Sequence, residues 1–177
     1  ALIARWPCKC RIPTRIGTQL NRRSPTATEM GIQIYINSPW ASAPAGRALY
    51  DTMQYVPAPI TIGAMVMAAS FATVILMSGS KGHRFALPNS RIHLHQPLIG
   101  GVLQGPATDL GIEAAHMLRL RDQLYKLMSD YTGKSPDLIH RDFDRTKWLF
   151  ADEAVAYGLA ARVLDRAPDI AAHRRPD

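Results

Sequence analysis

Cysteine is scarce in this chain of 177 residues, and this scarcity argues against structural disulfides and against a zinc site. The two cysteines are Cys8 and Cys10, both near the start. This number leaves no framework of structural disulfides, which suits a reducing interior. A Cys-x-Cys pair without a second pair or a nearby histidine falls short of the four ligands of a structural zinc site. We therefore expect no bound metal, no cofactor and a cytoplasmic location.

Long apolar runs are also missing. The longest stretch, from Ile62 to Met77, is interrupted only by Ser70 and Thr73. It falls short of the about 20 apolar residues that cross a bilayer. The first residues, Ala-Leu-Ile-Ala-Arg, do not predict the apolar region of a secretory signal. We expect no membrane partner, while the apolar content of 47% is typical of a globular protein with a buried core.

Acidic residues are almost absent from residues 1–29. Glu29 stands there against six basic residues, so this segment holds +5 of the net charge of +7. The basic residues are not interleaved with aromatic side chains on one surface, so we expect no nucleic-acid partner. The composition predicts a basic, disordered segment over 1–29, or alternatively an organelle transit segment. The rest divides into a folded domain over 30–166 and a flexible tail over 167–177.

Strands alternate with helices along the folded domain, and this order predicts an α/β protein. Strands are predicted where β-branched and apolar residues cluster between turn signals, and helices where apolar residues recur at helical spacing. The predicted strands are 31–38, a buried strand ending near Ala69, 85–87, 91–95 and 161–164. The predicted helices are 44–55, a buried one after Ser70, 108–131, one that starts at Ser135-Pro136, and 152–157.

The predicted helix 108–131 is long for so small a domain. Its apolar residues recur at roughly helical spacing and form a wide face. These residues are Ile112, Met117, Leu118, Leu120, Leu124, Leu127 and Met128. Such a face usually belongs to the core, but a helix of this length can also extend past the domain and pair with another subunit.

Ser70 stands where the buried strand gives way to a helix. A hydroxyl at such a junction lies beside the backbone N–H groups of the first helical turn, and these donors favour an oxyanion. On spacing alone, a small buried serine within an apolar run is the default interpretation of Ser70. Ala68 and Ala72 replace the glycines of a Gly-x-Ser-x-Gly elbow.

A serine nucleophile needs an imidazole to take its proton and a carboxylate to orient that imidazole. His93 and His95 lie two residues apart on a predicted strand, so they share one face. Two imidazoles without a third ligand do not make a metal site. Asp142 and Asp144 are the candidate carboxylates, and their spacing does not choose between them.

Several short motifs lie between residues 31 and 165. They are Ile34-Tyr-Ile-Asn-Ser-Pro39, Tyr50-Asp-Thr-Met-Gln-Tyr55, Ala68-Ala-Ser70, Arg84-Phe-Ala-Leu-Pro-Asn-Ser-Arg91, His95-Gln-Pro97, Gln104-Gly105, Thr132-Gly-Lys134 and Glu153-Ala-Val-Ala-Tyr-Gly-Leu159. Together they resemble the proteolytic subunits of caseinolytic protease, the ClpP family. The longer loop after Pro97 is similar to that of an actinobacterial paralogue group.

The resemblance implies a crotonase-like fold of stacked strand–strand–helix units with a long protruding helix. It also implies a serine endopeptidase, the proteolytic subunit of an ATP-dependent Clp-type protease, which cleaves unfolded polypeptides inside a ring chamber. The implied assembly is a homo- or hetero-oligomer of stacked heptameric rings served by an AAA+ unfoldase. Ser70 falls on the family's nucleophile and His95 on its general base.

The resemblance assigns further positions around this pair. The family's oxyanion-hole positions fall on Ala41 and Phe71. Tyr35 matches an aromatic residue of the pocket that docks the unfoldase, and the Asp144-Arg145 pair matches the contact between rings.

Two departures from the family pattern concern catalysis. Thr146 stands at the position of the triad aspartate, and Trp40-Ala41 stands where the family has Gly-Gly. A threonine can accept a hydrogen bond from the imidazole but cannot stabilise the imidazolium by charge, and loss of the aspartate costs about 10⁴ in rate in a comparable triad. The alternative is therefore a weak or inactive subunit that assembles with an active paralogue. A third hypothesis is acyl-thioester chemistry on the same fold, with backbone donors around Ala69 to Phe71.

Overall fold

The structure is a computed structural model, and it describes residues 32–39, 43–100, 102 and 104–165. The predicted basic segment 1–29, the predicted tail 167–177 and the Trp40-Ala41 pair lie outside these residues. The chain divides into two compact units, one formed by residues 1–94 with 148–177 and the other by residues 95–147. Each unit is described by itself.

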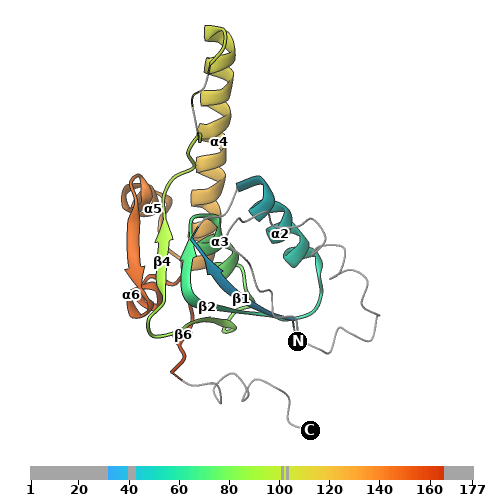
Figure 1. The fold of residues 1–177 in the computed structure, drawn as a ribbon, viewed down its shortest axis with the longest axis vertical. Coiled ribbons are helices and arrows are strands. Elements are labelled where there is room, and N and C mark those ends of the chain that lie inside the picture. The colour runs from blue at the N-terminus through green and yellow to red at the C-terminus, as the bar shows by residue number, and fades with distance from the viewer. Residues whose placement is uncertain (1–31, 40–42, 101, 103, 166–177) are drawn as a thin grey trace. The chain divides into compact units, whose positions relative to one another are not determined.

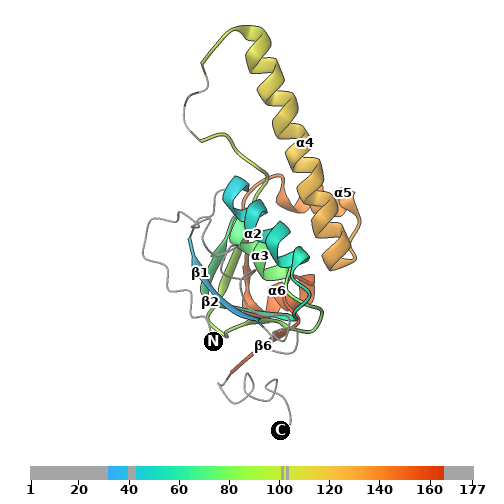
Figure 2. The ribbon, with the colours of Figure 1, turned by 90° about the vertical axis from the view of Figure 1, so that its right-hand side faces the viewer.

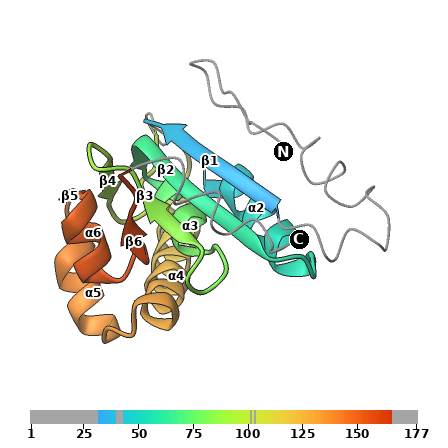
Figure 3. The ribbon, with the colours of Figure 1, turned by 90° about the horizontal axis from the view of Figure 1, so that it is seen from below.

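A largely parallel sheet forms the centre of the first unit. Its strands are β1 (Ile32–Ser38), β2 (Ile60–Ala69), β3 (Arg84–Ala86), β4 (Arg91–Leu94), β5 (Lys147–Phe150) and β6 (Arg162–Val163). Strands β1 and β2 run side by side (Figures 1 and 3). The N-terminal part of β2 pairs with β3 and its C-terminal part with β4, both in parallel. Because of this division, β4 lies beside the last residues of β2, where Ala69 pairs with His93.

Three helices belong to the same unit: α2 (Ala43–Tyr55), α3 (Phe71–Met77) and α6 (Ala151–Tyr157). Helices α2 and α3 lie on the same side of β1 and β2 (Figure 2). Every residue of α3 is buried, and so are Ile62, Ala64 and Ala68 of β2. Each large apolar side chain buried in this way contributes about 1.5–3 kcal/mol. The apolar run from Ile62 to Met77 therefore supplies much of the core and divides into strand and helix at Ser70 as predicted. The predicted burial of the strand is wrong for Met65 and Val66, which are exposed.

Strand β4 ends one residue earlier than predicted. The expected strand reached His95, but β4 stops at Leu94, so His95 does not share a strand with His93. The N–H of Gln96 donates to the Phe143 carbonyl instead of continuing the ladder, and Pro97 has no N–H to donate. Strand β5 was not predicted from the sequence.

The second unit contains two helices, α4 (Ala107–Thr132) and α5 (Pro136–Phe143). Helix α4 ends at Gly133 in a left-handed conformation with φ 71°, and Ser135 caps α5 by accepting the Leu138 N–H at 3.3 Å. Both signals were predicted from the sequence. Helix α5 packs beside the C-terminal part of α4 (Figure 2).

The apolar face predicted for the long helix is buried only in part. Leu124 and Met128 are buried, together with Tyr125, which the periodicity did not include. Nearer the N-terminus of α4, Ile112 is 61% exposed and Leu118 is 51% exposed. Of the two alternatives for this face, the core therefore does not hold for the N-terminal half of α4. Pairing of that half with another subunit stays a prediction.

Candidate active site

Ser70 has a backbone conformation that is rare for a residue with a side chain. Its φ is 58° and its ψ is −130°, and no other non-glycine residue among those described has a positive φ. Such a conformation costs about 1–3 kcal/mol and persists only where the surroundings hold it. The Ser70 N–H donates to the His93 carbonyl at 2.8 Å, and the Ser70 carbonyl accepts the Thr73 N–H at 3.0 Å. The sharp turn from β2 to α3 is thus fixed on both sides of the serine.

Phe71 follows this turn as the first residue of α3. The N–H groups of the first helical turn have no acceptor within their own helix, so the Phe71 N–H is open to an outside acceptor. This N–H is the donor that the sequence assigns to the oxyanion hole. The ring of Phe71 is 9% exposed and lies against the backbone of Gly46 in α2, where any side chain would overlap it. The other predicted oxyanion position, Ala41, lies outside the described residues.

His95 belongs to the second unit and is half-buried. Its Nδ1 lies 2.5 Å from the carbonyl oxygen of Gln96. A carbonyl oxygen only accepts hydrogen bonds, so this contact places a ring hydrogen on Nδ1, and in the neutral ring Nε2 is then the acceptor. This is the tautomer that a general base needs.

Thr146, which the family resemblance assigns to the position of the triad acid, is exposed. Among the residues that the structure describes, the Thr146 hydroxyl makes no hydrogen bond, so it does not orient His95 here. Asp142 forms an ion pair with Lys147 at 3.4 Å. Asp144 accepts two hydrogen bonds from the side-chain amide of Gln96. One goes to the Asp144 carboxylate Oδ1 at 3.3 Å and the other to the Asp144 backbone carbonyl at 2.8 Å.

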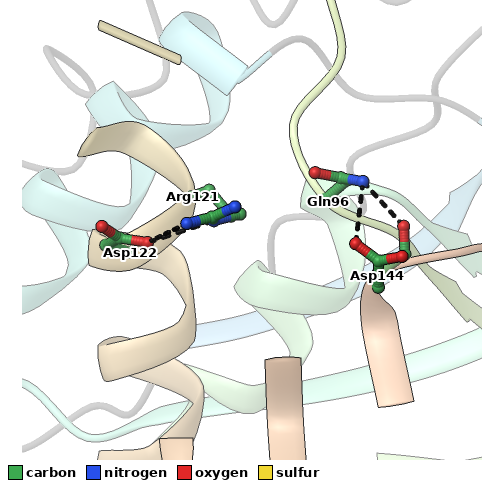
Figure 4. A network of polar contacts seen from close by, with 4 residues as sticks. All are labelled: Gln96, Arg121, Asp122 and Asp144. Carbon is green, nitrogen blue, oxygen red and sulfur yellow. Dashed lines mark hydrogen bonds and ion pairs between the residues drawn. The ribbon is translucent and has the colours of Figure 1, made fainter. Parts of the chain in front are cut away.

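Figure 4 shows the contacts of Gln96 with Asp144 together with a second polar pair. Gln96 faces Asp144, while Arg121 binds Asp122 within α4 at 2.9 Å. The Asp144-Arg145 pair, which resembles the family's contact between rings, has its charged atoms 3.8 Å apart, and the Arg145 side chain is 94% exposed. Such an exposed pair contributes little to folding.

Tyr125 is the buried titratable group of the second unit. Burial raises the pKa of its phenol, the nearby Arg121 lowers it, and Asp144 and Asp122 raise it further. Its hydroxyl has no hydrogen-bond partner among the described residues, and its ring makes an edge contact with His140 at 5.4 Å between centroids.

Tyr35 lines an apolar hollow on the first unit. The other lining residues include Gly63, Met65, Phe85, Leu87 and Leu164. The Tyr35 hydroxyl donates to Gln33 at 3.3 Å, and its ring lies over Gly63, where a Cβ would come within 3.3 Å of it. The hollow is therefore formed where a glycine lets the tyrosine ring lie across β2.

Within the described part of the chain, no three side chains of histidine, cysteine, aspartate or glutamate gather where they could hold a metal ion. In the same residues, no helix is both long and apolar enough to span a bilayer.

The sequence did not predict two residues that shape the site. Thr73, which it showed only as a polar interruption of the apolar run, hydrogen-bonds beside Ser70. The sequence signal for Thr73 was a hydroxyl within a buried apolar run, because a buried hydroxyl needs a hydrogen-bond partner. Gln96 stood in a recognised motif, but its contacts with His95 and Asp144 depend on the fold of the loop and have no sequence signal.

A mixed α/β unit with a strained serine at a strand-to-helix turn is the arrangement found in serine hydrolases. Comparison with known proteins identifies the family. A family model described as Clp protease matches residues 6–167. An "ATP-dependent Clp protease proteolytic subunit" of Porphyromonas gingivalis (strain ATCC BAA-308 / W83) is 45% identical over 135 residues, which are 76% of this chain. The chain belongs to the Clp protease family and has its crotonase-like fold. It spans 60% of the length of that relative.

Proposed function

We propose that this chain is the proteolytic subunit of an ATP-dependent Clp-type serine protease, with Ser70 as nucleophile and His95 as general base. The observation that carries the proposal is the backbone of Ser70, held at φ 58° between β2 and α3. A strained turn of this kind is maintained only where the surroundings impose it, and such strain clusters at functional sites. Family membership supplies the reaction class, which is hydrolysis of peptide bonds.

The proposed pairing of Ser70 with His95 rests on the family resemblance, and each residue directly follows a strand of the sheet. Ala69 of β2 lies opposite His93 of β4, so these parallel strands end at the same edge. Ser70 is the next residue after β2, and His95 is the next residue after β4. In α/β sheets the carboxyl ends of neighbouring strands are the usual place for catalytic groups. The Nδ1–H tautomer of His95 leaves Nε2 to take the serine proton.

The proposal includes the partners that the family resemblance implies. The chain forms stacked heptameric rings in the cytoplasm, and these receive unfolded polypeptides from an AAA+ unfoldase. The apolar hollow beside Tyr35 is the docking place for that unfoldase, which is supported by its lining of apolar side chains. The exposed apolar residues of α4, such as Ile112 and Leu118, and the Asp144-Arg145 pair are contacts between rings.

The proposal is tested by labelling the full chain with a serine-reactive fluorophosphonate and reading the adduct by intact mass. The Ser70→Ala variant is the matched control, and each protein is measured alone and mixed with an active ClpP from the same source. A single adduct that disappears in Ser70→Ala supports the peptidase. Rings that assemble without any adduct in either setting would overturn it, and would make this chain a structural subunit.

A further inference from the structure

We propose that Thr73 is a positioning residue for the nucleophile: its hydroxyl ties the turn at Ser70 to strands β2 and β4. The inference rests on the proposed function of Ser70. Thr73 itself does not touch the reacting atoms, and its role is to hold the backbone that carries the serine.

Thr73 is fully buried, at 0% exposure, in the first turn of α3. Its Oγ1 lies 2.8 Å from the carbonyl oxygen of Ala68 in β2 and 2.8 Å from that of His93 in β4. Both partners only accept, so the hydroxyl donates and its single hydrogen is shared between the two strands. One side chain therefore joins the helix to both strands at the point where they end.

The His93 carbonyl is the common point of this arrangement. It accepts the Ser70 N–H at 2.8 Å and the Thr73 hydroxyl at 2.8 Å, so the amide of the strained residue and a side chain three residues later meet on one oxygen. The Thr73 N–H in turn donates to the Ser70 carbonyl at 3.0 Å. Ser70 is thus enclosed by a ring of hydrogen bonds, which can hold a conformation that a serine does not favour.

A second buried hydroxyl provides a matched control. Ser90 is also 0% exposed and donates to two carbonyls of the same strand β2, those of Ala64 at 2.7 Å and Met65 at 2.8 Å. Its chemistry and burial equal those of Thr73, but it contacts β2 several residues before the turn. Loss of either hydroxyl leaves buried carbonyls with fewer donors, and only Thr73 acts on Ser70.

The experiment compares the full-length chain with Thr73→Val, Thr73→Ser and Ser90→Ala. Two quantities are measured: the rate of fluorophosphonate labelling by intact mass, and hydrogen exchange of the backbone across residues 68–73 by mass spectrometry. We expect Thr73→Val, which keeps the shape and removes the hydroxyl, to slow labelling by about 10- to 100-fold. Exchange of the Ser70 amide should become faster in the same variant. Thr73→Ser should restore both, and Ser90→Ala should change neither.

Each outcome decides the inference. Wild-type labelling rates and unchanged Ser70 exchange in Thr73→Val would overturn it, and so would equal slowing in Thr73→Ser or Ser90→Ala. If the wild-type chain takes no label, the proposed nucleophile fails, but faster Ser70 exchange confined to Thr73→Val still supports positioning, and unchanged exchange overturns it. Should Thr73→Val not fold, Thr73→Ala is measured in its place with the same criteria.

Discussion

The ring of Phe71 occupies the space that a side chain at Gly46 would need. Phe71 directly follows the strained Ser70, and Gly46 lies in the first turns of α2. The contact therefore ties α2 to the turn that carries the proposed nucleophile. Because both the glycine backbone and the aromatic ring are buried, neither partner can move aside without disturbing the core.

Gly46→Ala is expected to destabilise the fold by about 1–3 kcal/mol, because the added methyl overpacks against the Phe71 ring. Replacing glycine by alanine normally stabilises a helix interior, so a loss of stability in Gly46→Ala would point to the overpacking and not to helix propensity. The free energy of unfolding from urea titration measures it. Gly111→Ala is the matched control in α4, where nothing lies within 4 Å of the added methyl, and it should stabilise by about 0.5–1 kcal/mol.

A double-mutant cycle distinguishes the Phe71 contact from a general effect on α2. When Phe71→Ala removes the ring, the added methyl at position 46 has space, so the penalty of Gly46→Ala should shrink or vanish. Equal penalties of Gly46→Ala in the two backgrounds would contradict the contact.

The core of the first unit could be predicted because its signal is local. The apolar run of β2 and α3 showed both elements, and the hydroxyl of Ser70 marked the junction between them. The conformation of Ser70 could not be predicted in the same way. A positive φ at a non-glycine residue has no local preference behind it and is imposed here by the His93 carbonyl and Thr73, which the fold brings together.

In the second unit the ends of the helices could be predicted from the sequence, but the burial of α4 could not. The Gly133 stop and the Ser135 cap were predicted, since caps depend on neighbours in the chain. The periodicity of α4 showed an apolar face but did not show how much of it the monomer covers, and Ile112 and Leu118 are exposed. Burial depends on partners distant in sequence, which periodicity does not contain.

Thr146→Asp is expected to raise the rate of peptide hydrolysis by at least about tenfold, because a carboxylate stabilises the imidazolium that Thr146 cannot. Thr146 is exposed, so the change should leave the unfolding midpoint nearly unaltered. Cleavage of a fluorogenic peptide measures the effect, and Thr146→Asn is the uncharged control of equal shape. No gain in Thr146→Asp would indicate that the loop at Trp40-Ala41, and not the triad acid, limits the reaction.

Phe150→Ser is expected to stabilise the chain by about 0.5–2 kcal/mol through a new N-cap on α6. Phe150 stands at the cap position with its ring 62% exposed and no group that could accept a hydrogen bond. Glu153 already accepts the Phe150 N–H at 2.7 Å, so a serine would complete the reciprocal pair of a capping box. Thermal unfolding compares it with Phe150→Ala, which removes the ring without adding a cap. Equal midpoints for the two variants would rule out the capping explanation.

Tyr125→Phe is expected to stabilise the fold at pH 7 by about 1 kcal/mol. It removes a buried hydroxyl that has no hydrogen-bond partner among the described residues, and it keeps the ring contact with His140. The variant also changes the alkaline limb of the stability profile. Burial raises the pKa of Tyr125 above its ordinary value of 10.0, so the folded chain holds the phenolic proton at a pH where the unfolded chain has lost it. The stability linked to that proton is complete below pH 10 or so, and is lost as the pH rises through the folded pKa.

Urea titrations between about pH 8 and pH 11 measure this difference. The wild-type free energy of unfolding should fall more steeply above pH 10 or so than that of Tyr125→Phe. Tyr55→Phe is the control, since the Tyr55 ring is 77% exposed and its replacement removes no buried hydroxyl. Parallel curves for wild type and Tyr125→Phe would contradict the burial of the phenol. A lower stability of the variant at pH 7 would mean that the hydroxyl has a partner in the folded chain.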